Sequence, residues 1–133
     1  MWNIKQKLKQ LVSREIGAIK KDHGGKASVA LVYPNTYFVG MSNLGVHNVY
    51  RLINEDPARV CERAFLPERA DLAEHRRTNT PILTMESQRP ISDFDTIAFS
   101  VAFENDLENI KTILELSKVS KGHGPKIFIG GAA

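Results

Sequence analysis

Short runs of apolar residues alternate with helical patterns along this chain. In the clearest run, residues 27–33 are almost continuously apolar, which is typical of a strand buried on both faces of a parallel sheet. Pro34 ends this strand, because proline cannot donate to a sheet ladder. A polar turn containing glycine follows, and apolar residues at helical spacing then predict a helix up to Asn54, which Ser42 or Asn43 can cap. This stretch predicts a first strand–helix unit.

Further apolar runs predict three more strands, and helical patterns lie between them. The strands are expected at residues 60–66, 96–101 and 126–129, with an extended segment at 81–86. Helices are expected over 68–77, with Pro67 at the first helical position, and from Glu104 or Asn105 onwards. The last strand is predicted to be buried. The alternation predicts an α/β fold: a Rossmann-like or flavodoxin-like three-layer sandwich with a mainly parallel sheet of strand order 2-1-3-4.

An amphipathic helix of about five turns is predicted before the first strand. Its apolar positions are Trp2, Ile4, Leu8, Leu11, Val12, Ile16 and Ile19. Such a stripe needs a partner, either the rest of the domain or a second copy in a homo-oligomer. We therefore divide the chain into an N-terminal helix and loop (residues 1–26) and an α/β domain (residues 27–133).

Charge is concentrated at the N-terminus. The whole chain of 133 residues has a net charge of +3, and residues 1–26 carry seven lysines and arginines against two acids. A basic helix could contact RNA, an acidic lipid surface or an acidic partner. We interpret it as a solvated face and do not expect nucleic acid, because aromatic residues are not interleaved with the charges. Without a membrane-length apolar run or a signal-peptide pattern, a cytoplasmic location is expected.

The sequence contains no Walker loop, nucleophile elbow or zinc signature, so no catalytic or metal site is predicted. Its single cysteine, Cys61, excludes an internal disulfide, and we interpret it as a buried apolar residue. The four histidines are interpreted as structural or solvated: His23, in an exposed loop, and His47, His75 and His123. Glu104 is the one carboxylate expected near a cleft, although a first-turn helix charge explains it equally well.

The predicted topology favours a ligand site at the switch point between the strands that end at Tyr33 and Val101. Glycine and serine there would allow a ligand to approach the backbone, and the start of the following helix would suit a phosphate. The candidate cofactor-binding residues are Asn35, Thr36, Tyr37, Gly40, Met41, Ser42, Asn43, Gly45, Ser100, Val101, Ala102, Phe103, Glu104, Gly130 and Gly131.

Several stretches of the chain carry a family resemblance in combination. They are Val32–Gly45, Cys61–Pro67, Glu86–Asp95, Phe99–Glu104 and Ile129–Gly131. Over roughly residues 27–131 the chain resembles the N-terminal region of cobalamin-binding-domain radical SAM proteins, often labelled iron–sulfur oxidoreductases. The resemblance implies a cobalamin-binding or cobalamin-binding-like domain followed by a radical SAM barrel, in which a Cys-x-x-x-Cys-x-x-Cys motif holds a [4Fe–4S] cluster and S-adenosylmethionine.

The single cysteine departs from that pattern, so the cluster and S-adenosylmethionine are expected only in a downstream barrel of a longer protein. This chain alone is not expected to be catalytic. A second departure is that residues 35–40 lack the Asp-x-His-x-x-Gly histidine that ligates cobalt in methyltransferases. Any bound cobalamin is therefore expected to keep water or another non-protein ligand.

Two functional hypotheses remain open. In the first, the domain holds cobalamin or positions substrate for the barrel, and a roomy cleft lined by small residues would favour it. In the second, it is an interaction domain that kept the fold and lost the cofactor, and a cleft filled by Tyr37, Phe38 and Phe103 would favour that. A free-standing signalling domain is less well supported, because a receiver needs acidic residues where Pro34 and Asn35 stand.

Overall fold

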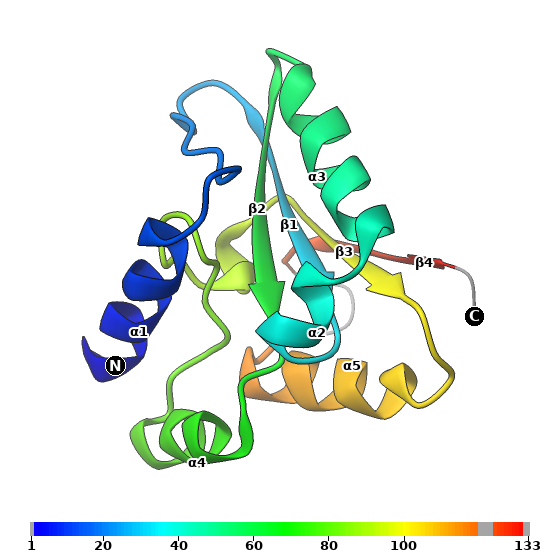
Figure 1. The fold of residues 1–133 in the computed structure, drawn as a ribbon. Helices are drawn as coiled ribbons and strands as arrows, with labels where there is room; N and C mark the ends of the chain where they lie inside the picture. Colours follow the sequence, from blue (N-terminus) through cyan, green and yellow to red (C-terminus); the bar gives the residue numbers. More distant parts are fainter. Residues whose placement is uncertain (1, 120–123, 132–133) are drawn as a thin grey trace.

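A computed structural model describes residues 2–119 and 124–131, which form a four-stranded, all-parallel sheet with helices around it (Figure 1). The strands are β1 (Ala27–Tyr33), β2 (Arg59–Phe65), β3 (Thr96–Val101) and β4 (Lys126–Gly131). Their order, β2-β1-β3-β4, confirms the predicted α/β architecture. His123 lies outside the described residues.

Helices cover both faces of the sheet. They are α1 (Trp2–Ser13), α2 (Tyr37–Met41), α3 (Leu44–Glu55), α4 (Arg69–Thr78) and α5 (Asp106–Leu116), with a short 3-10 helix η1 (Ile91–Asp93). In β1, Ala30 and Val32 join the buried cluster that contains α5, whereas Leu31 and Tyr33 join the cluster that contains α3. Successive side chains of a strand point to opposite faces, so β1 needs apolar residues throughout. This explains its continuous apolar run.

The two outer strands differ at their edges. On β2, the Met85 N–H donates to the Arg63 carbonyl at 2.7 Å, which satisfies part of the outer edge. On β4 every residue is exposed, and Ile127, Phe128 and Ile129 are 40%, 62% and 57% exposed. The prediction that this last strand is buried is wrong, because within the described residues β4 pairs only with β3 and lies at the sheet edge.

The N-terminal helix is shorter than predicted. α1 ends at Ser13, whose hydroxyl donates to the Gln10 carbonyl at 2.7 Å. Ile4 and Val12 are buried against the domain, as the amphipathic pattern predicts, but Ile16 lies beyond the helix and is fully exposed. The prediction of about five turns is therefore wrong, whereas the expected packing of the stripe on the domain is confirmed for its central part.

Residues 14–26, here called the strap, explain why α1 stops. The Ile19 N–H donates to the Tyr50 hydroxyl of α3 at 2.7 Å, and the Glu15 carboxylate binds Arg63 of β2 at 2.7 Å. Lys21 Nζ donates to the carbonyls of Asn54, Asp56 and Arg59. These tertiary contacts hold the strap in an extended path across α3 and β2, which a continued helix could not follow.

Three local features differ from the sequence prediction. The polar turn after β1 contains the short helix α2, and of the two candidate caps Asn43 is the one that caps α3. Helix α4 begins at Arg69, so the prediction that Pro67 occupies the first helical position is wrong. In place of the predicted extended segment at 81–86, only an isolated bridge pairs Leu83 with Pro90, and the chain turns at residues 85–87.

Candidate functional site

The parallel sheet brings the three predicted site segments to one edge, here called the carboxyl edge. It comprises residues 34–45 after β1, residues 102–105 after β3, and residues 130–131 at the end of β4. In doubly wound folds ligands bind beyond this edge. A ligand can bind at this edge only if the residues leave space for it and have hydrogen-bonding groups that are not already paired within the chain.

The loop after β1 is held mainly by its own hydrogen bonds. The Asn35 N–H donates to the Tyr33 carbonyl at 2.8 Å, and the Thr36 N–H donates to Asn35 Oδ1 at 2.7 Å. Gly40 is required by packing, because a Cβ there would lie 2.3 Å from the Phe65 ring. This glycine therefore serves close approach of α2 to β2 rather than of a ligand to the backbone.

At the start of α3, polar groups are likewise satisfied within the chain. Asn43 Oδ1 accepts from the Val46 N–H at 3.1 Å, and Gly45 follows in the exposed first turn. The Met41 carbonyl lies 2.8 Å from His47 Nε2, and Ser42 Oγ donates to a carbonyl of α2 at 3.3 Å. The helix start that sequence analysis assigned to a phosphate is thus partly occupied by its own cap.

Tyr37 points away from the β1–β3 junction. Its hydroxyl donates to Glu15 Oε2 at 2.7 Å, and its ring packs edge-on against Phe65 at 5.3 Å between centroids. Burial and the neighbouring Glu15 carboxylate raise the pKa of this phenol. The structure therefore separates Tyr37 from the other predicted residues and places it beside the strap.

The loop after β3 is closed by Asp106, a buried residue that sequence analysis did not single out. Asp106 Oδ2 accepts from the N–H groups of Ala102 and Phe103 at 3.1 and 3.0 Å. Asn109 Nδ2 also donates to the Pro34 carbonyl at 2.9 Å, which ties α5 to the loop after β1. The two loop N–H groups best placed to bind an anion are therefore already paired. In the sequence, the position of Asp106 shortly after a predicted strand was the only indication that it closes this loop.

A hollow of about 230 Å³ opens between the ends of β3 and β4. It is lined by Val101, Glu104, Leu107, Ile129, Gly130 and Gly131. Ser100 lies beside it, paired with Gly130 in the sheet. Gly131 has φ +141°, and a Cβ there would lie 1.9 Å from the Val101 carbonyl oxygen, whereas Gly130 faces open space. Of the two glycines, only Gly130 leaves room for a ligand.

This hollow does not fit an enclosed cobalamin. Pockets that bury a drug-sized ligand have volumes of about 300–1,000 Å³, and a corrinoid with its nucleotide tail is larger than such ligands. The paired N–H groups of Ala102 and Phe103 would also have to be released before they could bind the tail phosphate.

Exposed apolar side chains lie on the segments that form the carboxyl edge, and we call them the apolar rim. Phe38, Leu44 and Phe103 are 67%, 79% and 58% exposed. Val39 and Leu107 add to the same rim. Clustered apolar residues of this kind mark contact surfaces more often than solvent-facing loops. Phe38 and Phe103 are mostly exposed, so they do not fill a cleft at the β1–β3 junction as one sequence hypothesis supposed.

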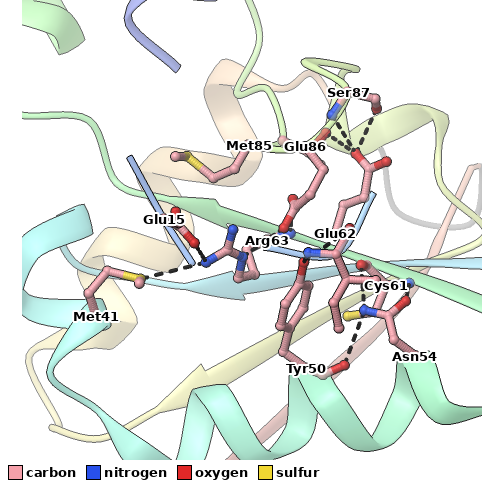
Figure 2. A network of polar contacts seen from close by, with 12 residues as sticks. Glu15, Met41, Tyr50, Asn54, Cys61, Glu62, Arg63, Met85, Glu86 and Ser87 are labelled. Carbon is pink, nitrogen blue, oxygen red and sulfur yellow. Dashed lines mark hydrogen bonds and ion pairs between the residues drawn. The ribbon is translucent and has the colours of Figure 1, made fainter. Parts of the chain in front are cut away.

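A buried ionic network lies behind this edge, and sequence analysis did not predict it. Figure 2 shows Arg63 at its centre, with Nε donating to Glu86 Oε2 and Nη1 donating to Glu15 Oε1, each at 2.7 Å. The three side chains are at most 8% exposed, and the guanidinium carbon lies 4.6 Å from the centre of the Tyr50 ring. Arg63 Nη2 is buried without a partner among the described residues.

The neighbouring Glu62 points to the opposite face of β2 and is also saturated. Its Oε1 accepts from the hydroxyls of Thr84 and Ser87, both at 2.6 Å, and its Oε2 lies 2.6 Å from His23 Nε2. Burial alone would raise the pKa of Glu62, but these hydrogen bonds outweigh it and lower the pKa. The prediction that His23 is an exposed loop histidine is wrong, because this contact holds it half-buried.

These contacts join two of the stretches that carry the family resemblance, residues 61–67 and 86–95. They have a structural role: they attach the segment after α4 to the outer edge of β2. Consecutive charges, Glu62 and Arg63, inside a predicted buried strand were the signal in the sequence. Asn54 of α3 also holds β2 in place. Its side-chain Oδ1 accepts from the Cys61 N–H, and its Nδ2 donates to the Cys61 carbonyl.

Cys61 is buried, as predicted, and burial raises the pKa of its thiol to about 12. Within residues 2–119 and 124–131, no group of three or more His, Cys, Asp or Glu side chains is arranged to hold a metal ion. None of the described helices is long and apolar enough to cross a membrane.

Comparison with known proteins finds a match to one protein family. A family model described as "Radical SAM proteins, N-terminal" matches residues 45–126, which is more than half of the chain. The matched segment runs from α3 to the start of β4 and contains Arg63 and Glu86 of the ionic network, but Glu15 and the loop before Gly45 lie outside it. No curated protein and no solved structure matches the chain significantly.

Proposed function

Because the chain belongs to the family of N-terminal regions of radical SAM proteins, we propose that it is a non-catalytic module that docks on the catalytic domain of its protein. Docking uses the apolar rim of the carboxyl edge, and it positions the catalytic domain or its substrate. The observation that carries this proposal is the exposure of Phe38, Leu44 and Phe103 at an edge where several backbone N–H groups are already paired within the chain. Burial of this rim in a partner would remove apolar surface from water.

The chemistry of the residues indicates which tasks belong to the catalytic domain and which belong to this chain. A radical SAM domain supplies an iron–sulfur cluster and S-adenosylmethionine, and cluster ligation uses several thiolates. This chain has one cysteine, and its thiol is buried and protonated. The module therefore contributes binding surface rather than cluster ligands.

Docking is tested by producing this chain and the catalytic domain of its protein separately and measuring their affinity by calorimetry. Replacing both rim phenylalanines, Phe38→Ser with Phe103→Ser, is expected to weaken the complex at least tenfold. Leu52→Ser is the matched control, since Leu52 is 56% exposed on α3 but lies about 12 Å along the helix from its start. Equal effects of the two variants, or no complex at all, would contradict the proposal.

Cobalamin binding is the second function that this edge could support, because Gly130 leaves open space beside the hollow. Hydroxocobalamin is titrated into the wild-type chain and into Gly130→Trp, and the absorbance spectrum is followed. The docking proposal predicts no spectral change at micromolar cobalamin. Tight binding that is lost in Gly130→Trp would instead favour a cofactor module.

A further inference from the structure

A second cavity lies beside the carboxyl edge and shares Phe38 with the apolar rim. It has a volume of about 250 Å³ and lies between α1, α4 and residues 82–85, beyond the end of β2. Apolar side chains supply most of its wall, chiefly Leu8, Leu11, Phe65, Ile82 and Met85. An ion pair between Lys7 of α1 and Asp71 of α4 closes one side.

Aromatic rings form the end of this cavity that lies nearest the strap. Tyr37 packs edge-on against both Phe65 and Phe38, with centroids 5.3 and 5.4 Å apart. The Tyr37 hydroxyl is already bonded to Glu15, so its ring is fixed in place. Edge-to-face packing is the arrangement in which aromatic rings attract one another, so this wall suits a further ring.

His75 of α4 adds a polar group to the same cavity. Its side chain is 4% exposed, and its Nδ1 lies 3.0 Å from the Thr80 carbonyl oxygen. Because a carbonyl only accepts, Nδ1 carries the hydrogen, and burial lowers the pKa of the ring so that it stays neutral. Nε2 is then the acceptor of the ring, and His75 borders both this cavity and the hollow lined by Thr112 and Leu116.

We propose that this cavity binds a small, uncharged aromatic molecule that carries one hydrogen-bond donor, such as a phenol. The ring would lie among Leu8, Phe65 and Met85, and the donor would reach Nε2 of His75. An apolar cavity of about 150 Å³ is large enough to hold benzene, so a substituted single ring fits the volume available. This proposal does not rest on docking at the carboxyl edge, although Phe38 borders both the cavity and the apolar rim.

The test compares two probes, 4-methylphenol with a donor hydroxyl and 4-methylanisole in which a methoxy group replaces it, titrated into the whole chain by calorimetry. We expect 4-methylphenol to bind at least fivefold more tightly. His75→Phe should remove that preference, and Leu8→Trp, which fills the cavity, should abolish binding of both probes. Leu52→Trp is the matched control on an exposed face and should change neither affinity.

A second measurement uses only the wild-type chain, so it remains valid if one of the variants fails to fold. Methyl shifts of the wild-type chain are recorded during the phenol titration, and those of Leu8, Leu11 and Ile82 should move together. Equal affinity for the two probes, absence of binding, or shifts confined to residues outside this cavity would each overturn the proposal. Shifts confined to Thr112 and Leu116 would place the ligand in the hollow on the other side of His75 and would also overturn it.

Discussion

Glu86 holds Arg63 by both of its carboxylate oxygens: Oε1 accepts from the Arg63 backbone N–H at 2.9 Å, and Oε2 accepts from Nε at 2.7 Å. The two residues are 23 positions apart, on β2 and on the segment after α4. Each side chain is at most 2% exposed. One carboxylate therefore fixes both the outer edge of a strand and the only buried guanidinium of the network in Figure 2.

Removing this carboxylate should be strongly destabilising. Glu86→Ala leaves Arg63 buried with Glu15 as its one remaining acidic partner, and breaking a buried pair in this way costs about 3–5 kcal/mol. Urea unfolding at pH 7 measures the change in the free energy of unfolding. Glu55→Ala is the control, because the Arg51–Glu55 pair is exposed and such pairs contribute little. Similar losses in the two variants would contradict a special role for Glu86.

The strap makes the N-terminal segment part of the fold. Deleting residues 1–21 removes the buried side chains of α1, the Glu15 carboxylate and the three bonds of Lys21. We expect Tm to fall by at least about 10 °C, since several kcal/mol are lost. The measurement is a thermal melt combined with gel filtration. An unchanged Tm and elution volume would show that the segment is dispensable.

Glu62 should make the protein sensitive to acid. Its pKa is lowered in the folded state relative to its ordinary value of 4.5, so its contribution to stability is present above that pH and is lost as the pH falls below it. Wild type and Glu62→Gln are compared by urea unfolding between pH 3 and pH 7. The variant should be less stable at pH 7, and the two curves should converge towards pH 3. Parallel curves would contradict this assignment.

Cys61 should be inert towards thiol reagents while the protein is folded. The thiol is fully buried, and a pKa of about 12 leaves almost no thiolate at pH 8. Alkylation by iodoacetamide, followed by mass spectrometry, should require urea above the unfolding midpoint. Rapid labelling in native buffer would show that β2 opens locally.

The strands were predictable from sequence because a parallel sheet covered on both faces needs continuous apolar runs, as in residues 27–33 and 96–101. The exposure of β4 could not be predicted from its composition, since residues 127–129 are apolar although they lie at an edge. The length of α1 was also misjudged, because the contacts of Glu15 and Lys21 that end it come from residues distant in sequence.

The sequence predicted which segments meet at the carboxyl edge, whereas ligand binding by them stays a prediction. Parallel topology brings the three segments to one edge, which sequence alternation indicates. The local hydrogen bonds that occupy that edge were not visible, because Asp106 and Asn109 act across a loop and between elements. Glycine was a weak guide to a ligand site, because Gly40 and Gly131 are needed for close packing and, of the candidate site glycines, only Gly130 faces open space.

Hydrogen–deuterium exchange tests the docking account most directly. Exchange is measured by mass spectrometry on this chain alone and with the catalytic domain of its protein at saturating concentration. The account predicts slower exchange in residues 37–45 and 102–107, which carry the apolar rim, and unchanged exchange at the C-terminal end of α3. Unchanged exchange in both rim segments, or protection confined to surfaces away from the carboxyl edge, would contradict it.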